Sequence, residues 1–311
     1  MANYLVTGGA GFIGSNLVRA LLRAEHSVRV LDNFETGKRE NLAETKDHIE
    51  IMEGDIRDPD TCRLACADME VVLHQAALGS VPRSVNDPAT SNAVNVDGTV
   101  NMLWAAKQAK VRRFVFAASS AAYGESADLP KREDMTPLPI SPYGVSKLTC
   151  EHYCRVFYLA YGLESFSLRY FNVFGPRQDP TSQYAAVIPL FISALLRKKR
   201  PVVFDDGEQT RDFTYIDNIV QANILAANAP KAQGQVINIA CQDQISLNRI
   251  LDILRELLHT DIAAKYTAPR PGDIKHSLAD ISRAKELLGY EPRVNFEQGL
   301  RIAIDWYKAN L

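Results

Sequence analysis

Short apolar runs alternate with longer amphipathic stretches along the first 170 residues of the chain. Runs of four to eight residues rich in β-branched and aromatic side chains are typical of strands, whereas apolar residues repeated every three or four positions indicate helices. The runs predict strands at residues 3–8, 27–32, 49–55, 71–76, 113–120 and 165–172. The amphipathic stretches predict helices that include 12–24, 95–109 and 141–162. Strands separated by helices predict an α/β fold with a doubly wound, mostly parallel sheet.

This rhythm changes after Asn172, where turn residues interrupt the pattern. A loop is expected at 174–183, followed by a helix at 187–198, a strand at 201–204, a strand and then a helix within 210–227, and a strand at 236–240. Two helices are expected to close the chain. This second part is too small and too interrupted for another complete wound sheet. It is therefore interpreted as a cap over the C-terminal ends of the first sheet's strands, where open α/β sheets hold ligands.

The predicted domains follow from this division of the chain. Residues 1–172 are expected to form a dinucleotide-binding domain, to which 213–240 would return. The remainder of 173–311 is expected to form mainly a smaller α/β substrate domain.

Composition narrows the classes of function. The 311 residues carry a formal net charge of −2, with 46% apolar and 23% charged residues, which is ordinary for a globular protein. This charge gives no general attraction to nucleic acid or to an anionic membrane. The N-terminus lacks a basic segment followed by an apolar one, and no run approaches the roughly 18–20 apolar residues that span a bilayer. We expect a cytoplasmic protein without nucleic-acid or membrane partners.

The five cysteines do not predict a disulfide framework, because their number is odd and the chain is large. Cys62 and Cys66, like Cys150 and Cys154, are four positions apart. That spacing leaves a metal site open, but no histidine pair of matching spacing accompanies it and both pairs fall in helical patterns. Reduced, packed thiols and no metal are expected.

A glycine-rich stretch, TGGAGFIG at 7–14, follows the first predicted strand and opens the first predicted helix. Gly8, Gly11 and Gly14 satisfy G-x-x-G-x-x-G, and Gly9 gives G-x-G-x-x-G with the last two. Glycines there allow a tight turn and close approach of the backbone to a pyrophosphate, which the helix N-terminus attracts. Flexible turns also produce such motifs by chance, but the flanking strand and helix favour a dinucleotide site.

Two acidic residues extend this prediction. Asp32 ends the second predicted strand, 18 residues beyond Gly14, where a carboxylate binds an adenosine ribose and repels the 2′-phosphate of NADP. NAD is therefore the predicted cofactor, with a turn aspartate as the alternative interpretation of Asp32. Asp55, after the third predicted strand, is expected to meet the adenine or simply to form a turn.

Tyr143 and Lys147 are four positions apart and so share one face of a predicted helix. A phenol with a pKa near ~10 becomes a base at neutral pH only after a shift of about 3 units, on the order of 4 kcal/mol. The lysine and a positively charged nicotinamide ring together would favour the phenolate. Ser119 and Ser120, at the end of the fifth predicted strand, are candidates to relay or orient the proton. The alternatives are a surface Tyr–Lys pair and a polar strand end.

The chain combines TGGAGFIG, Asp32, GDI at 54–56, the serine pair, Y-x-x-x-K and RYFNVFGP at 169–176. This combination resembles the extended short-chain dehydrogenase/reductases. Within them, the chain most closely resembles NAD-dependent nucleotide-sugar epimerases, of the UDP-N-acetylglucosamine and UDP-glucose 4-epimerase type, over essentially its whole length. The resemblance implies a Rossmann sheet with a nucleotide-sugar-binding cap. It also implies a homodimer formed through helices at 95–109 and 142–161.

The resemblance assigns roles to individual residues. Tyr143 would be the base, Lys147 would hold the nicotinamide ribose and lower the tyrosine pKa, and Ser119, with Ser120 beside it, would be the catalytic serine. The cofactor-binding residues implied are Gly8, Gly11, Phe12, Ile13, Gly14, Asp32, Asn33, Asp55, Ile56, Gln75, Ala76, Tyr143, Lys147, Tyr170 and Val173. The substrate-binding residues implied are Gly79, Ser80, Val81, Ser119, Ser120, Tyr143, Asn172, Val187, Phe204, Arg211, Arg270, Asp273 and Ser277.

The substrate-binding set divides by the part of the nucleotide sugar that each member would meet. Asn172, Arg211 and Arg270 would bind the diphosphate. The uridine would lie against Val187 and Phe204, whose alternative role is core packing, and Asp273 is a candidate for the ribose.

The reaction implied is epimerisation, because Ser119–Ser120–Ala121 stands where related dehydratases carry an Asp–Glu pair. Two further features favour an acetamido sugar. The loop at 74–88 resembles that of UDP-N-acetylglucosamine 4-epimerases, and Ser277 stands where epimerases restricted to plain hexoses have a tyrosine. A solvent-facing serine is the alternative, and a larger pocket usually broadens specificity before it switches it. UDP-glucose 4-epimerase, UDP-glucuronate 4-epimerase with Arg83 on the carboxylate, a decarboxylase and a non-catalytic NAD-binding regulator remain open.

Overall fold

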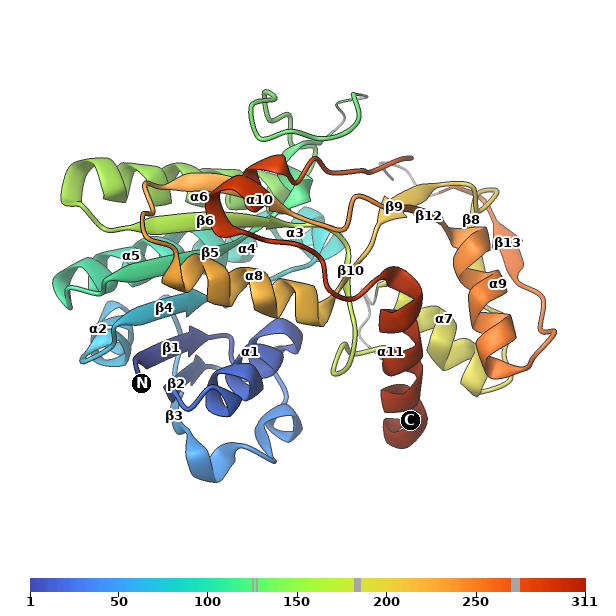
Figure 1. Ribbon diagram of the computed structural model, residues 1–311, viewed down its shortest axis with the longest axis horizontal. Coiled ribbons are helices and arrows are strands. Elements are labelled where there is room, and N and C mark those ends of the chain that lie inside the picture. Colours follow the sequence, from blue (N-terminus) through green and yellow to red (C-terminus); the bar gives the residue numbers. More distant parts are fainter. Residues whose placement is uncertain (125, 127, 182–185, 270–274) are drawn as a thin grey trace.

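A seven-stranded parallel sheet forms the centre of the computed structural model, which describes residues 1–124, 126, 128–181, 186–269 and 275–311 (Figure 1). The strand order is β11–β6–β5–β4–β1–β2–β3. The strands are β1 (Asn3–Thr7), β2 (Ser27–Asp32), β3 (Glu50–Glu53), β4 (Val71–His74), β5 (Arg113–Ser119), β6 (Ser165–Tyr170) and β11 (Gln235–Ile239). The chain reverses its direction of winding between β1 and β4, and this switch point is where such sheets bind ligands.

The doubly wound α/β fold predicted from the sequence is confirmed by this sheet and by the helices on its two faces. One face packs against α2 (Pro59–Cys66), α5 (Gly98–Gln108) and α6 (Pro142–Tyr161), and the other against α1 (Phe12–Arg23) and α8 (Ile216–Asn228). The late segment also contributes to the sheet, because β11 pairs in parallel with β6.

The two hydrophobic cores follow from the alternation of side chains along each strand. In β1, Tyr4 and Val6 pack in one core with Leu17 of α1, whereas Leu5 packs in the other with Met102 of α5. The buried strands of a parallel sheet need apolar residues on both faces, which explains their nearly continuous apolar runs.

A chain of short helices connects β4 to α5. It consists of α3 (Val81–Asn86), α4 (Pro88–Asn92) and a π-helical turn at Ala93–Asp97 that runs directly into α5. The helix expected at 95–109 therefore exists, but its first turn is π-helical, which apolar periodicity does not reveal.

The C-terminal part forms a smaller lobe beside the sheet (Figure 1). Its helices are α7 (Val187–Leu196), α9 (Leu247–Leu258) and α11 (Phe296–Asn310), with α10 (Ser282–Leu288) returning to β11 and α8. Its strands pair two by two: β7 (Val173–Phe174) with β10 (Thr214–Tyr215), β9 (Thr210–Asp212) with β12 (Gln244–Ser246), and β8 (Val202–Phe204) with β13 (Lys265–Thr267). The expectation of two closing helices was wrong, since α9, α10 and α11 all follow β11. The seven residues of α10 are too few for a helical period to be plain.

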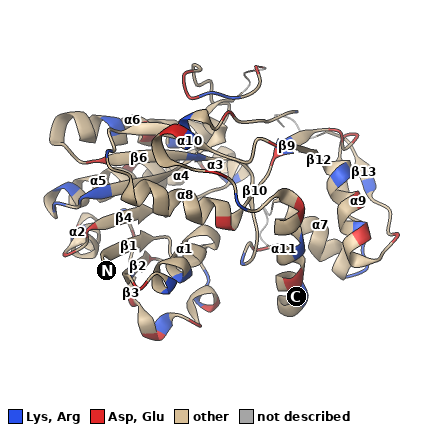
Figure 2. Cartoon of the chain, viewed as in Figure 1, with Lys and Arg blue, Asp and Glu red and all other residues tan. Residues whose placement is uncertain are grey.

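Acidic and basic residues are interspersed along α9 and α11 (Figure 2). In the described part of the chain, no helix has both the length and the apolar character to cross a bilayer. Cys62, Cys66, Cys150 and Cys154 are buried free thiols packed in the core that holds α2, α5 and α6. The described residues include no group of three or more His, Cys, Asp or Glu side chains arranged to hold a metal ion.

Candidate functional site

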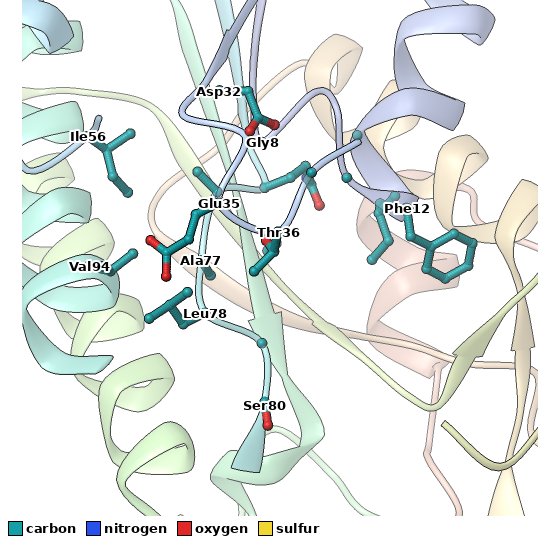
Figure 3. A pocket seen from close by; sticks show the side chains of 18 of the residues that line it. Gly8, Phe12, Asp32, Glu35, Thr36, Ile56, Ala77, Leu78, Ser80 and Val94 are labelled. Atoms are coloured by element: carbon teal, nitrogen blue, oxygen red, sulfur yellow. The ribbon is translucent and has the colours of Figure 1, made fainter. Parts of the chain in front are cut away.

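A cleft of about 670 Å³ opens at the carboxyl ends of β1, β2, β4 and β5 (Figure 3). Most of the residues predicted to bind the cofactor line it, together with part of the predicted substrate set. Those brought together are Gly8, Gly11, Phe12, Ile13, Gly14, Asp32, Asn33, Asp55, Ile56, Gln75, Ala76, Gly79, Ser80, Tyr143, Lys147 and Tyr170. The cleft lies at the switch point of the sheet, where the glycine loop and the catalytic pair predicted from the sequence meet.

The glycine loop forms the floor of the cleft through its backbone. Gly8 has a left-handed φ of +66°, and a Cβ there would lie 2.8 Å from the main-chain nitrogen of Ala76. A Cβ on Gly14 would lie only 2.1 Å from the carbonyl oxygen of Gly8. Larger residues would therefore disrupt this cradle, which leads directly into the N-terminus of α1. The arrangement fits the diphosphate of a dinucleotide, which would meet backbone N–H groups and the positive end of the helix dipole.

Asp32 lies at the end of β2 and is held by two main-chain donors. Its carboxylate accepts hydrogen bonds from the N–H groups of Ala10, at 2.9 Å, and Phe34, at 2.8 Å. Burial raises the pKa of Asp32, and these two hydrogen bonds oppose the rise. The carboxylate is thus fixed beside the glycine loop, where the sequence predicted contact with the adenosine ribose.

Asp55 lines the cleft and also forms a turn, and its contact with the adenine stays a prediction. It accepts hydrogen bonds from the side chain and main-chain N–H of Arg57 and from the side-chain amide of Asn33, the last at 2.9 Å. The hydrogen bonds from the Arg57 side chain lower the pKa of Asp55 to about 2, against the effect of burial. Asp55 is therefore ionised across the ordinary working range of pH.

The pair Tyr143 and Lys147 is held on the first turns of α6, which begins at Pro142 after the cap Ser141. Lys147 donates a hydrogen bond from Nζ to the carbonyl oxygen of Ala117, at 2.8 Å, and Nζ lies 5.9 Å from the centroid of the Tyr143 ring. Burial lowers the pKa of Lys147 to about 8. The phenol and the ammonium that the sequence predicted on one helix face therefore both lie in the cleft.

Tyr143 is not acidified in the protein alone. Burial raises its pKa, and a hydrogen bond with Ser119 opposes this rise only in part. The lowering that the sequence attributed to Lys147 does not contribute, because the pKa of Tyr143 responds to burial and to Ser119, whereas Nζ of Lys147 is hydrogen-bonded to the carbonyl oxygen of Ala117. Activation of the phenol would need a further positive charge nearby, which an oxidised nicotinamide ring supplies.

The serine pair stands beside this tyrosine at the end of β5. The hydroxyl of Ser119 accepts a hydrogen bond from the N–H of Ala121, at 3.2 Å, and so caps the short 3-10 turn at Ser120–Ala122. Both serines are half-buried but lie outside the lining of the dinucleotide cleft. Of the two, Ser119 is the one whose hydroxyl acts on the phenol of Tyr143 and lowers its pKa.

The residues predicted for the diphosphate and the sugar form a second group around β9. Asn172 donates hydrogen bonds from Nδ2 to the carbonyl oxygen of Asp212, at 3.0 Å, and to the hydroxyl of Ser277, at 3.3 Å. Arg211 donates to the carbonyl oxygens of Thr210 and Lys275. Neither Asn172, Arg211 nor Ser277 is part of the dinucleotide cleft lining.

The remaining predicted residues are more dispersed. Val187 begins α7, Phe204 ends β8, Val173 begins β7, and all three are half-buried outside the cleft lining. Val81 begins α3 and is exposed, whereas its neighbour Ser80 lines the cleft and caps that helix by accepting a hydrogen bond from the N–H of Arg83. Arg270 and Asp273 lie outside the described residues.

Asn95 is a residue of this region that sequence reasoning missed. It lies in the π-helical turn before α5 and is almost fully buried. Its Oδ1 accepts a hydrogen bond from the N–H of Leu78, at 2.8 Å, and its Nδ2 donates to the hydroxyl of Ser146, at 3.1 Å. It thus fixes the loop after β4 against the helix that carries Tyr143. A polar residue within a helical pattern gave no signal of this role.

Glu35 and Arg83 also line the cleft and were not predicted to bind the cofactor. They form an ion pair that joins the loop after β2 to α3, in the connection after β4. A second ion pair, between Lys38 and Asp179, joins the loop after β2 to the loop after β7, at 2.8 Å. Oppositely charged residues so far apart in sequence carry no signal of pairing.

Comparison with known proteins identifies the family to which this chain belongs. The family model for NAD-dependent epimerases and dehydratases matches residues 4–240, which span nearly the whole central sheet. The chain belongs to the NAD-dependent epimerase/dehydratase family. A glycine cradle, an acidic residue at the end of β2 and a Tyr–Lys pair on α6 are thus found in a protein of an NAD-dependent family.

Individual members of the family resemble the chain over its full length. It is 39% identical over 308 residues to a putative UDP-glucose 4-epimerase of Methanocaldococcus jannaschii, covering 98% of each chain. A UDP-N-acetylglucosamine 4-epimerase from Methanobrevibacter ruminantium M1, solved with UDP-N-acetylmuramic acid, is 43% identical with a TM-score of 0.95, covering 100% of this chain and 99% of the other. A UDP-glucose 4-epimerase from Thermus thermophilus, solved with NAD, is 34% identical with a TM-score of 0.91, covering 99% and 100%.

Proposed function

We propose that this protein is an NAD-dependent 4-epimerase of UDP-hexoses, with UDP-N-acetylglucosamine and UDP-N-acetylgalactosamine as the favoured pair. UDP-glucose and UDP-galactose are expected to be accepted as well. The observation that carries the proposal is that Tyr143 and Lys147 line the same cleft as the glycine cradle and Asp32, with Ser119 next to the phenol of Tyr143. The comparisons support a UDP-sugar 4-epimerase in general and leave the sugar to be decided by this chain's own residues.

The residues present fit NAD as a resident cofactor. The backbone of Gly8, Gly11 and Gly14 would receive the diphosphate, and Asp32 would accept hydrogen bonds from the adenosine ribose. Lys147, anchored on the carbonyl oxygen of Ala117, would donate to the nicotinamide ribose. When bound, the cofactor supplies a reversible hydride acceptor next to Tyr143.

The protein's own part in the reaction is then acid–base catalysis at the carbon-4 hydroxyl. Tyr143 would take the proton of this hydroxyl while carbon 4 gives up a hydride, and Ser119 would hold the oxygen through its hydrogen bond with the tyrosine. The flat 4-keto sugar would turn over, regain a hydride on its other face and recover the proton from Tyr143. No net oxidant is consumed, so the cofactor need not leave between turnovers.

The choice of an acetamido sugar rests on Ser277. Its hydroxyl lies within 3.3 Å of the side-chain amide of Asn172, so this serine is directed into the group around β9 and is only partly exposed. A small side chain at that position leaves room for a 2-acetamido group beside the residue proposed to bind the diphosphate. A pocket with this room would still admit the smaller hexose.

Two alternatives are less well supported by the geometry. A UDP-glucuronate enzyme needs a cation for the substrate carboxylate, but Arg83, the residue considered for it, is already paired with Glu35. A non-catalytic NAD-binding regulator would have no need of a tyrosine that lies beside both Ser119 and the ammonium of Lys147, which is 5.9 Å from its ring centroid.

A homodimer is proposed as the assembled form. Several large apolar side chains on α5 and α6 are exposed although they lie on helices packed against the sheet: Trp104, Val145, Val156, Leu159 and Tyr161. Exposed apolar surface of this kind on adjacent helices suits a partner. The resemblance of α5 and α6 to the interface helices of the family names that partner as a second copy of this chain.

The test of the proposed reaction is a conversion assay. Purified protein is incubated separately with UDP-N-acetylglucosamine and UDP-glucose, with no added reductant, and each 4-epimer is resolved by proton NMR. We expect conversion of the acetamido sugar at least as fast as that of the plain one. Conversion of UDP-glucose alone would contradict the sugar assignment, and conversion of neither would contradict the proposed reaction.

A further inference from the structure

Asp212, at the end of β9, carries a fully buried carboxylate that is held by main-chain groups. Its Oδ1 accepts a hydrogen bond from the N–H of Cys241, at 2.9 Å. Its Oδ2 accepts from the N–H groups of Gln242, at 3.1 Å, and Ala279, at 3.2 Å. An ionised carboxylate receives these donors better than a protonated one, because both of its oxygens are then strong acceptors. One side chain therefore joins β9 to the loop after β11 and to the segment before α10.

The main chain of the same residue holds two side chains of the proposed substrate site. Its carbonyl oxygen accepts the hydrogen bond from Nδ2 of Asn172, at 3.0 Å, and its N–H donates to Oγ of Ser277, at 3.4 Å. Ala279, which the carboxylate binds, is two residues after Ser277. The main chain of Asp212 thus binds Ser277 and its side chain binds Ala279, so both hold the same short segment.

We propose that ionised Asp212 is a positioning residue for nucleotide-sugar recognition, which gathers three chain segments and thereby sets Asn172 and Ser277 for the substrate. This inference rests on the proposed function, because it takes those two residues as the substrate's contacts. Loss of the charge would release at least one of the main-chain donors and let the segment that carries Ser277 shift. Substrate affinity would fall, while the groups that line the dinucleotide cleft, of which Asp212 is not one, would be unaffected.

The surroundings of Asp212 make its charge sensitive to pH. Burial raises the pKa of its carboxyl to about 6, although the main-chain hydrogen bonds act to lower it. The side chains facing it from the neighbouring elements are the Cys241 thiol and the Tyr290 phenol, whose own pKa values are raised mainly by burial, so both are neutral near pH 6. The nearby cations point elsewhere, since Arg211 donates to main-chain oxygens and Lys285 donates to the side chain of Gln242.

The charge state of Asp212 determines how substrate binding should change with pH. Above about pH 6 the carboxylate is charged and all of its donors are paired. Below that value it becomes protonated, so the oxygen that carries the proton becomes a poor acceptor and the hydrogen bonds that it receives from buried N–H groups weaken. The KM for a UDP-sugar should therefore rise as the pH falls through about 6 and stay level above it.

The test uses Asp212→Asn, which keeps the side chain's shape and removes its charge, with the exposed Asp217→Asn as the matched control. We expect Asp212→Asn to raise the KM for UDP-glucose roughly tenfold at about pH 7.5, as expected for one unpaired buried donor, with kcat and bound NAD nearly unchanged. Its KM should no longer respond to pH as the pH passes through about 6. Asp217→Asn should behave as the wild type does.

Several results would overturn the inference. A fall in kcat or in bound NAD as large as the rise in KM would indicate a general structural role. A pH dependence of KM that persists in Asp212→Asn would assign that dependence to a group other than Asp212. If this variant does not fold, calorimetry of UDP-glucose binding to the intact Tyr143→Phe holoenzyme decides, because binding that is equally tight below and above about pH 6 contradicts the proposal.

The same calorimetry separates this inference from the proposed reaction. pH-dependent binding of UDP-glucose without turnover by the wild type would uphold the role of Asp212 and overturn the epimerase reaction. Absence of any binding of UDP-sugars would overturn both.

Discussion

The side-chain amide of Asn172 donates a hydrogen bond to the hydroxyl of Ser277, although the two residues are 105 positions apart in the chain. Asn172 follows β6 of the central sheet, whereas Ser277 belongs to the segment before α10. The bond therefore joins the sheet that forms the dinucleotide cleft to the C-terminal part of the chain. It places the residue proposed to decide the sugar next to the residue proposed to bind the diphosphate.

A bulky residue in place of Ser277 should exclude the acetamido sugar. We expect Ser277→Tyr to lower kcat/KM for UDP-N-acetylglucosamine by roughly 10–200-fold, the range typical of a steric clash in a pocket, and to leave that for UDP-glucose within a few-fold. The measurement is kcat/KM for each sugar. Ser277→Ala, which keeps the space, is the control and should turn over both. Equal losses for the two sugars in Ser277→Tyr would show that this position does not choose between them.

Removal of the proposed base should abolish most turnover without emptying the site. Tyr143→Phe keeps the ring, so kcat should fall by about 10²–10⁴-fold while NAD and UDP-sugar remain bound. Tyr161→Phe, at the exposed end of the same helix, is the matched control and should retain full activity. Steady-state kinetics and cofactor absorbance are the readouts. Turnover of Tyr143→Phe at the wild-type rate is the result that this mechanism does not allow.

The binding of NAD should weaken at alkaline pH. Burial lowers the pKa of Lys147 to about 8, so the protein alone holds a charged ammonium below that pH and loses it as the pH rises through it. The positive charge favours the anionic diphosphate of the dinucleotide. We therefore expect the dissociation constant for NAD, measured by calorimetry on stripped protein, to rise above about pH 8. Lys147→Met should bind more weakly at all pH values and lack this step, and a step that survives in it would belong to another group.

The pH dependence that Lys147 gives to the stability of the fold has the opposite sign to the pH dependence expected for NAD binding. Because its pKa is lower in the folded than in the unfolded chain, the unfolded state binds more protons between about pH 8 and the ordinary pKa of lysine. Stability of the cofactor-free wild type should rise with pH across that window, relative to Lys147→Met. Denaturant unfolding of both proteins at several pH values measures this difference.

A substitution at Leu159 should disrupt the proposed dimer, because this residue would lie in the subunit interface. This residue on α6 is 66% exposed in the single chain, which is unusual for a leucine on a helix that packs on the sheet. We expect Leu159→Glu to produce monomers in sedimentation experiments, because a carboxylate cannot be buried without a partner. Leu64→Glu, on the exposed side of α2, should stay dimeric. A wild-type protein that sediments as a monomer would contradict the proposal outright.

Features that depend on local pattern could be predicted from the sequence. The inner strands β1, β4 and β5 are buried on both faces, so their apolar runs are nearly continuous, and the order of strands between helices reveals the winding. The glycine loop could be recognised because the turn excludes side chains at Gly8 and Gly14. The Tyr143–Lys147 pair could be recognised because four positions are about one helical turn.

Features that depend on contacts between distant segments could not be predicted. The ion pair of Glu35 with Arg83 joins two segments whose approach only the folded chain defines. Asn95 belongs to a π-helical turn, a local departure from the α-helical period. The role of Asp212 depends on main-chain N–H groups from two other segments, which have no side-chain signature.

The central claim is that carbon 4 loses and regains the same hydride within one active site. The most direct measurement uses UDP-sugar deuterated at carbon 4, converted in ordinary water and analysed by NMR and mass spectrometry. The account predicts that the 4-epimer formed keeps its deuterium at carbon 4, since the hydride returns before the keto sugar leaves. Replacement of the deuterium by solvent hydrogen would contradict it, because the bond would then have been broken by proton abstraction.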